Sequence, residues 1–183
     1  KAAFFGGITF AFSATLLVWG AEIWQAVHAV IWLPLILLSI EKTIFTRNSS
    51  YVVLGGFGLA ASIMAGYIQP TIYILITIFT YSLFRLLPFP FSFSKIPIRT
   101  VLSIVFIIVL GIGLSAIHTF PGVEAFLLSP RREVALTDVN LSFLLPIWHT
   151  VTFFAPDIFG HTATQNWFLN RPGQYYESMI FIG

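Results

Sequence analysis

The sequence predicts an all-α protein, a polytopic bundle of transmembrane helices with a long extracytoplasmic segment. Of its 183 residues, 57% are hydrophobic and 9% are charged, whereas a soluble globular domain has about 25% charged residues. The charged residues flank long apolar runs, several of which have the roughly 20 residues that a helix needs to cross a bilayer. This composition excludes a soluble domain, and the absence of cysteine excludes a disulfide scaffold or a thiolate metal site.

Five runs have the length and composition of complete transmembrane helices. They cover Ala2–Gly20, Trp24–Ile40, Tyr51–Tyr67, Pro70–Leu87 and Thr100–His118. The first contains no charged residue, and the second is slightly short and contains His28 and Pro34. Because the chain starts at Lys1 rather than at methionine and stops at Gly183 inside a further apolar run, we expect an internal fragment of a longer protein.

The charges between the predicted helices indicate their orientation in the membrane. Basic residues concentrate in two short loops, residues 41–50 and 85–99, whereas the long segment 119–175 has three basic and four acidic residues. By the positive-inside rule, both short loops are cytoplasmic and the long segment is outside. The sequence therefore predicts five helices over residues 1–118, an extracytoplasmic loop with interfacial helices over 119–175, and the start of a sixth helix over 176–183.

The predicted helices pair into two antiparallel hairpins. Short outer turns that begin at Gly20 and Gly66 join the first helix to the second and the third to the fourth. Small residues recur four positions apart and would let helix backbones approach closely, which we interpret as packing faces rather than gating elements. These pairs are Gly7 with Ala11, Gly56 with Ala60, Ala61 with Ala65, and Gly111 with Ser115.

Part of the long segment has the composition of an interfacial helix. The stretch Leu141–Ala155 is too short to span the bilayer and is interrupted by Pro146. Its Trp148 and His149 suit the headgroup region. A site framed by such helices at the membrane surface would suit a substrate with a lipid tail and a polar head.

Nearly all residues that could take part in chemistry fall on the predicted outer face. The two turns contribute Glu22 and Gln69, and His118 ends the fifth helix. The long segment and its end add Glu124, Arg131, Arg132, Glu133, Asp138, His149, Asp157, His161 and Glu177. Since an ionisable group is costly in lipid, this placement indicates an outer-face site. The short turns would allow Glu22 and Gln69 to line one shared cavity.

Several of these residues have two interpretations. Arg131 and Arg132 either clamp a phosphate, to which a guanidinium presents a planar fork of donors, or lie among lipid headgroups and neighbouring acids. Glu22 is either a ligand contact or a solvated turn residue, and Gln69 is either a ligand contact or a helix cap. For His28, a structural hydrogen bond between helices is favoured over a proton relay.

Several function classes lack their sequence signatures. His149, Asp157 and His161 match no metal-ligand spacing, so we predict no metal site. The chain has no GxSxG, P-loop or GxGxxG motif, so hydrolase, ATP-driven and dinucleotide functions have no support and we predict no cofactor. The net charge is +2, but there is no basic stripe, so nucleic acid is not an expected partner.

Five sequence blocks occur in order along nearly all of the chain. They are WQAVHAVIWLPLILLSIEK, AGYIQPTIYILI, LSAIHTFPGVEAFLLSPRR, FFAPDIFG and YYESMIFIG. In order and rough spacing they resemble the YfhO-type bacterial integral membrane proteins, which belong with the membrane glycosyltransferase-like superfamily of GT-C architecture. The residues that carry the resemblance are Trp32, Pro34, Gly66, Gln69, Glu124, Ser129, Arg131, Pro156, Gly160 and Glu177.

This resemblance implies a glycosyltransferase-like protein in the bacterial cytoplasmic membrane. Such a protein would transfer a sugar from a polyprenyl-phosphate donor to a cell-envelope polymer, such as a teichoic acid, on the outer face of the lipid bilayer. The catalytic acid of the superfamily usually lies in the first outer loop, upstream of this chain. No residue here is therefore assigned as the general base.

Substrate-binding roles follow from the resemblance and from the predicted outer-face site. Arg131 and Arg132 would hold the leaving phosphate as charge develops on it. The residues that would orient the sugar or the arginines, shape the acceptor side or otherwise contact substrate are Glu22, Gln69, Glu124, Asp157, His161 and Glu177. Two alternatives stay open: a transporter or flippase for a polyprenyl-linked or other lipid, and a non-catalytic envelope-assembly protein.

Overall fold

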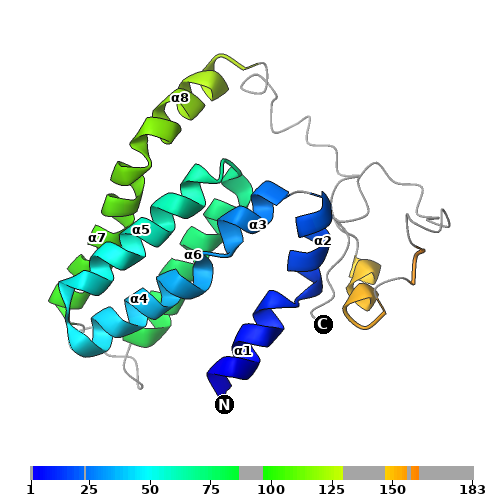
Figure 1. Ribbon diagram of the computed structural model, residues 1–183, viewed down its shortest axis with the longest axis horizontal. Coiled ribbons are helices and arrows are strands. Elements are labelled where there is room, and N and C mark those ends of the chain that lie inside the picture. Colours follow the sequence, from blue (N-terminus) through cyan, green and yellow to red (C-terminus); the bar gives the residue numbers. More distant parts are fainter. Residues whose placement is uncertain (1, 23, 87–96, 130–146, 156–157, 161–183) are drawn as a thin grey trace. The chain divides into compact units, whose positions relative to one another are not determined.

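The computed structural model describes residues 2–22, 24–86, 97–129, 147–155 and 158–160. Its helices are α1 (Ala2–Ala11), α2 (Ala14–Glu22), α3 (Trp24–Val30), α4 (Leu33–Thr46), α5 (Ser49–Met64), α6 (Ile68–Leu86), α7 (Ile98–Leu114), α8 (Ala116–Leu127) and a short 3₁₀ helix, η5 (Ile147–Phe153) (Figure 1). These described residues contain no strand, which confirms the predicted all-α class. The chain divides into two compact units, Lys1–Trp24 with Pro130–Gly183, and Gln25–Ser129.

The Gln25–Ser129 unit is built around α4, α5, α6 and α7, which run in alternating directions (Figure 1). Each of these helices contributes two aliphatic side chains to one buried core: Ile36, Ile40, Val52, Leu59, Ile74, Ile78, Ile104 and Ile107. Large apolar side chains on their other faces are exposed, among them Val53, Phe79 and Phe106. An apolar exterior around an apolar core is typical of a helix bundle that lies in lipid.

Glycine allows α5 and α7 to pack with their backbones close together. A Cβ atom at Gly56 would lie 2.7 Å from Leu110 Cδ2, and one at Gly111 would lie 2.7 Å from Leu59 Cδ2. Carbon atoms in contact are normally about 3.5–4.0 Å apart, so neither position has room for a side chain. This geometry confirms the prediction that Gly56 and Gly111 are packing positions.

The predicted first transmembrane helix, Ala2–Gly20, is divided in the structure into α1 and α2. At the break the Ser13 hydroxyl donates to the Phe10 carbonyl at 3.0 Å, so a side chain competes with the backbone for this acceptor. The predicted packing face at Gly7 has no neighbour among the described residues, because none of their atoms lies within 4 Å of a Cβ placed there.

The predicted second helix, Trp24–Ile40, is interrupted and is longer than expected. The helix α3 ends at Val30 and α4 begins at Leu33, because Pro34 in the first turn of α4 has no N–H to donate to the Val30 carbonyl. Together the two helices cover Trp24–Thr46, 23 residues that are apolar enough to cross a membrane.

A helix cap at Asn48 and a glycine turn at Gly66 determine where the hairpin of α5 and α6 begins and where it turns. The Asn48 side chain accepts a hydrogen bond from the Ser50 backbone N–H at 3.0 Å, so this cap starts α5 slightly before the predicted Tyr51. Gly66 has a φ of 80°, a left-handed conformation that glycine adopts without steric cost. It forms the tight turn between the two helices that the sequence predicts.

The predicted fifth helix, Thr100–His118, ends earlier than expected. The helix α7 stops at Leu114, and α8 leaves it at an angle of 71°. At this joint Ser115 is fully buried and its hydroxyl donates to the Ile112 carbonyl at 3.1 Å, which competes with the helical hydrogen-bond ladder. His118 therefore lies in α8 rather than at the end of a span.

The predicted number of complete spans is not reached by the described helices. By length and composition Trp24–Thr46 is a candidate membrane span, and the bent pair of α7 and α8 is a second if the pair counts as one broken span. The helix α5 is apolar but has 16 residues, and Gln, Thr and Tyr residues make the 19-residue α6 less apolar. The count of five spans and the domain boundaries at residues 118 and 175 stay predictions.

The stretch Leu141–Ala155, predicted as an interfacial helix, is described from residue 147 onward. It contains η5, in which Ile147 and Trp148 are exposed. An exposed Trp fits the headgroup region of a bilayer, and the interfacial role stays a prediction.

An ion pair joins α4 to α6 at the end of the unit that carries the basic loops. Arg85 contacts both carboxylate oxygens of Glu41, and its Nε donates to Oε2 at 2.9 Å. The Tyr81 hydroxyl donates to the same Oε2 at 2.7 Å. The Arg85 guanidinium also lies over the Phe45 ring, 5.5 Å from its centroid. These contacts tie together the ends of two helices that are not adjacent in sequence.

Gly111→Ala should destabilise the protein, because the new methyl group collides with Leu59 and overpacking typically costs about 1–3 kcal/mol. Gly113→Ala on the same helix is the matched control, since nothing lies within 4 Å of its Cβ position. Alanine there should leave stability unchanged or raise it by up to about 1 kcal/mol. Thermal unfolding in detergent, followed by tryptophan fluorescence, compares the variants. Equal melting temperatures would contradict the close packing of α5 and α7.

Arg85→Gln should lower the melting temperature more than Lys42→Gln does, because Arg85 pairs with Glu41 whereas Lys42 is an exposed residue on the same helix as Glu41. Salt screens a partly exposed ion pair, so the difference between the variants should shrink from about 0.1 M to about 1 M NaCl. The measurement is thermal unfolding at the two salt concentrations. A difference that salt leaves unchanged would show that the pair does not act through charge.

Candidate functional site

Gln69 and His118, two described residues of the predicted outer face, lie at one end of the Gln25–Ser129 unit, and His28 lies there as well. At this end α3 leads into α4, α5 turns into α6, and α7 bends into α8 (Figure 1). His28, Gln69 and His118 come from these three connections. The described basic residues lie at or next to the opposite ends of the helices; they are Lys42, Arg47, Arg85 and Arg99. The unit therefore has one end with histidine and amide groups and one end with cations.

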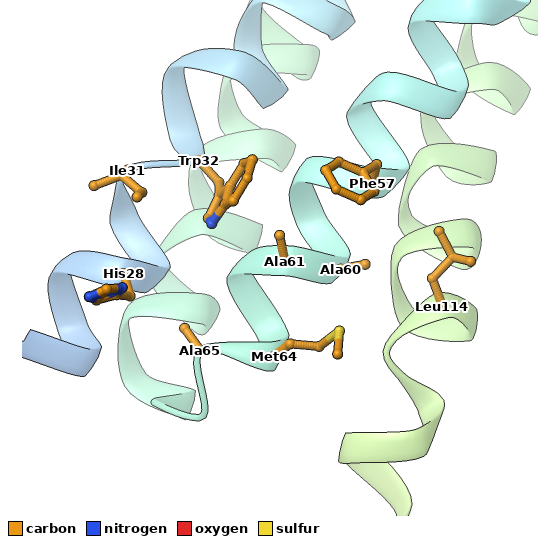
Figure 2. Close-up of a pocket in the computed structure, with 9 residues that line it drawn as sticks. All are labelled: His28, Ile31, Trp32, Phe57, Ala60, Ala61, Met64, Ala65 and Leu114. Carbon is orange, nitrogen blue, oxygen red and sulfur yellow. The ribbon is translucent and has the colours of Figure 1, made fainter.

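A cavity of about 550 Å³ lies at the first of these ends, between α3, the start of α4, α5 and the end of α7 (Figure 2). It is lined by His28, Ile31, Trp32, Phe57, Ala60, Ala61, Met64, Ala65 and Leu114. This volume is within the range of about 300–1,000 Å³ that is typical of small-ligand sites. We refer to it as the alanine cavity, after Ala60 and Ala61 of α5 and Ala65, the residue that caps this helix.

Small side chains on α5 create the alanine cavity. Ala60, Ala61 and Ala65 share one face of the helix, and their methyl groups leave space that larger side chains would fill. The pair Ala61 and Ala65, predicted as a packing face, therefore lines a cavity. Beside it Trp32 and Phe57 meet edge to face, with ring centroids 5.9 Å apart and planes at 87°.

The alanine cavity is apolar except on the side formed by the break between α3 and α4. There His28 contributes an imidazole and Trp32 an indole ring with its N–H (Figure 2). An indole N–H can only donate, and among the described residues that of Trp32 has no acceptor. None of the described residues in the lining carries a carboxylate. The cavity therefore suits an amphiphile with an apolar chain and a polar end that accepts hydrogen bonds.

A second cavity, of about 390 Å³, lies between the α5–α6 turn and α8. Its polar side chains are those of Thr71, His118 and Thr119. A Cβ atom at Gly66 would lie 3.7 Å from both Cε1 and Nε2 of His118, so the imidazole packs against the turn. Both threonine hydroxyls donate to backbone carbonyls four residues earlier. His118 is thus the ionisable group among the described residues of this lining.

Two of the predicted substrate-binding side chains are described by the structure, those of Gln69 and Glu124. The Gln69 side-chain N–H donates to the Tyr73 hydroxyl at 2.8 Å, one turn further along α6. The Gln69 amide N–H is therefore hydrogen-bonded within α6, to the side chain of Tyr73. Glu124 is exposed on α8. Neither residue lines the alanine cavity, although both belong to the same end of the unit.

The remaining predicted site residues are not placed beside these two. Glu22 ends α2 in the other compact unit, so a cavity shared with Gln69 stays a prediction. Arg131, Arg132, Asp157, His161 and Glu177 lie outside the described residues. The phosphate clamp is therefore also a prediction. Within the part of the chain that is described, no three His, Asp or Glu side chains gather to hold a metal ion.

The sequence does not identify most of the residues that line the alanine cavity. Phe57, Met64 and Leu114 are ordinary apolar residues and belong to no motif. The available signal is the group of alanines on α5, which by sequence alone is equally a packing face. His28, for which a structural role is predicted, lines the cavity as well.

The model of one protein family, described as "Bacterial membrane protein YfhO", matches residues 1–183. The matched residues include both compact units and all of the residues that line the two cavities. No curated protein and no solved structure matches the chain.

Proposed function

The chain belongs to the YfhO family of bacterial membrane proteins, and on that premise we propose that it acts as a membrane glycosyltransferase. In this proposal a sugar passes from a polyprenyl-phosphate donor to a cell-envelope acceptor on the outer face of the membrane. The observation that carries it is the alanine cavity, an apolar space at the end of the unit where His28, Gln69 and His118 lie. A lipid-linked sugar needs an apolar space and polar groups side by side.

The distribution of charge supports an outer-face site. The described basic residues of the Gln25–Ser129 unit are all at the end opposite the alanine cavity; they are Lys42, Arg47, Arg85 and Arg99. Short loops rich in Lys and Arg stay on the cytoplasmic side. We therefore propose a multi-pass protein with five spans whose alanine cavity faces outward and whose long segment is extracytoplasmic.

The proposed reaction exchanges one bond to the anomeric carbon for another. The acceptor hydroxyl attacks this carbon, the bond to the phosphate oxygen breaks, and the phosphate leaves with the negative charge. A general base removes the hydroxyl proton, and no residue of this chain is assigned to that role. Arg131 and Arg132 bind the leaving phosphate as its charge develops, which lowers the barrier if their donors are already in position.

The other proposed contacts surround the sugar and the acceptor. Gln69 and Glu124 belong to the outer end of the unit, on α6 and α8, and are assigned to orient the sugar or the arginines. Both side chains are exposed, so a ligand can reach them. The residues assigned on sequence grounds alone are Glu22 for the sugar side, Asp157 and His161 for the acceptor side, and Glu177 for a further substrate contact.

A lipid transporter or flippase is the second candidate, and one observation favours it. Transporters bind their substrates where transmembrane helices are discontinuous, and the break between α3 and α4 borders the alanine cavity through Ile31 and Trp32. The enzyme is preferred because the described charged side chains of the unit lie toward its two ends rather than midway along its helices.

Arg131→Ala should reduce sugar transfer at least tenfold, because it removes a charged donor to the leaving phosphate and such hydrogen bonds contribute about 1.5–3 kcal/mol. The assay uses protein reconstituted in liposomes with a radiolabelled polyprenyl-phosphate sugar and a cell-envelope acceptor. Arg99→Ala is the matched control, since it removes an arginine at the opposite end of the unit, and it should leave transfer within about twofold of wild type.

The same liposomes separate the candidate functions. Wild-type protein that transfers no sugar but moves labelled lipid between leaflets would replace the glycosyltransferase with the flippase. Wild-type protein that does neither would contradict both and leave the envelope-assembly role. Equal losses in the two arginine variants would contradict the phosphate clamp.

A further inference from the structure

We infer that the alanine cavity binds a phosphate-bearing lipid, with the phosphate held by the Trp32 indole N–H and by His28. The lipid chain then lies over the alanines of α5. The inference rests on the proposed function in one respect, namely that the bound lipid is the polyprenyl-phosphate donor. Neither Trp32 nor His28 has a substrate role in the prediction made from sequence, which places the phosphate on Arg131 and Arg132.

The first observation is an unpaired donor that is held in place. Trp32 precedes α4 and packs against both the buried core and the Phe57 ring. Its indole N–H has no acceptor among the described residues. Trp32 is partly buried, and wherever the bilayer excludes water from such a donor it is costly to leave without an acceptor, such as a ligand oxygen. A phosphate oxygen is a strong acceptor for such a donor.

The second observation is the chemistry of the surrounding lining. His28 and Trp32 both line the side of the cavity at which the chain passes from α3 to α4 (Figure 2). Among the described lining residues His28 is the one ionisable group, and none of them is a carboxylate that would compete with an anion. An imidazole N–H can donate to an acceptor, as an indole N–H does. The polar side of the cavity is therefore suited to a ligand group that accepts hydrogen bonds.

The third observation concerns the space available for the hydrocarbon chain of the lipid. Ala60, Ala61 and Ala65 leave an apolar trough along one face of α5. Ile31, 48% exposed, and Met64, 51% exposed, also line the cavity, so it is accessible from the outside of the bundle. Met adapts its shape to an irregular ligand. A lipid can enter sideways from the bilayer, with its head at the helix break and its chain along α5.

Trp32→Phe tests the hydrogen bond and keeps the aromatic contact with Phe57. Binding of radiolabelled polyprenyl phosphate is measured on the full chain in maltoside detergent, which contains no phosphate, next to binding of the unphosphorylated polyprenol. The variant should bind polyprenyl phosphate about tenfold more weakly and polyprenol as well as wild type does. His28→Phe should show the same selective loss. Trp148→Phe, at an exposed Trp of η5, is the control and should change neither.

Ala61→Phe tests where the hydrocarbon chain of the lipid lies, because the larger side chain fills the apolar trough beside the alanines. It should weaken binding of polyprenyl phosphate and of polyprenol at least tenfold, because both lose the same space. Val53→Phe on the outside of α5 is the matched control and should leave both affinities unchanged. Tryptophan fluorescence melting verifies that each variant is folded.

Each outcome decides one part of the inference. Equal effects of Trp32→Phe on the phosphorylated and unphosphorylated lipids, or no effect on either, would overturn the phosphate contact. Competition by phosphatidylglycerol as strong as that by polyprenyl phosphate would overturn the assignment to the donor. If wild type transfers no sugar but Trp32→Phe still loses phosphate-dependent binding, the proposed function fails and the lipid site stands. If Trp32→Phe transfers sugar and binds donor normally, the site fails and the function stands.

Discussion

The close approach of α5 and α7 is the constraint on which the rest of the structure depends. Gly56 and Gly111 have no side chain, so each helix receives a leucine of the other directly on its backbone. This contact fixes the position along α5 that lies next to the C-terminal end of α7. It thereby brings Leu114 to the alanine cavity and the Ser115 joint close to the α5–α6 turn. The geometry of the candidate site therefore depends on Gly56 and Gly111, two packing positions that have no reactive side chain.

The helical class of the protein could be predicted because its signals are local. Apolar runs, the Asn48 cap and the Gly66 turn act within a few residues of where they stand in sequence. The interruptions at Ser13 and Ser115 could not be predicted in the same way. A serine hydroxyl competes with the backbone for a carbonyl in many continuous helices, and whether the helix breaks depends on neighbouring elements. Pro34 is a local signal, but apolar residues on both sides of it give the appearance of one unbroken span.

The grouping of Gln69 and His118 at one end could be predicted from the alternation of short turns and basic loops, whereas His28 is predicted inside the second helix. The alanine cavity could not be predicted, because a cavity is the volume that neighbouring helices fail to fill and sequence does not give the spacing between helices. Trp32 shows the difference. Trp32 is one of the residues that carry the family resemblance, whereas only the fold shows that no described residue accepts from its indole N–H.

The pairing of Glu41 with Arg85 has a consequence for how the protein is assembled. The two residues are 44 positions apart, and a chain made from its N-terminus presents the carboxylate well before the guanidinium exists. Until α6 has been synthesised, the Glu41 carboxylate of α4 has no Arg85 guanidinium to pair with. The ends of α4 and α6 can therefore be joined only after α6 is complete, which makes the ion pair a late step in the assembly of the Gln25–Ser129 unit.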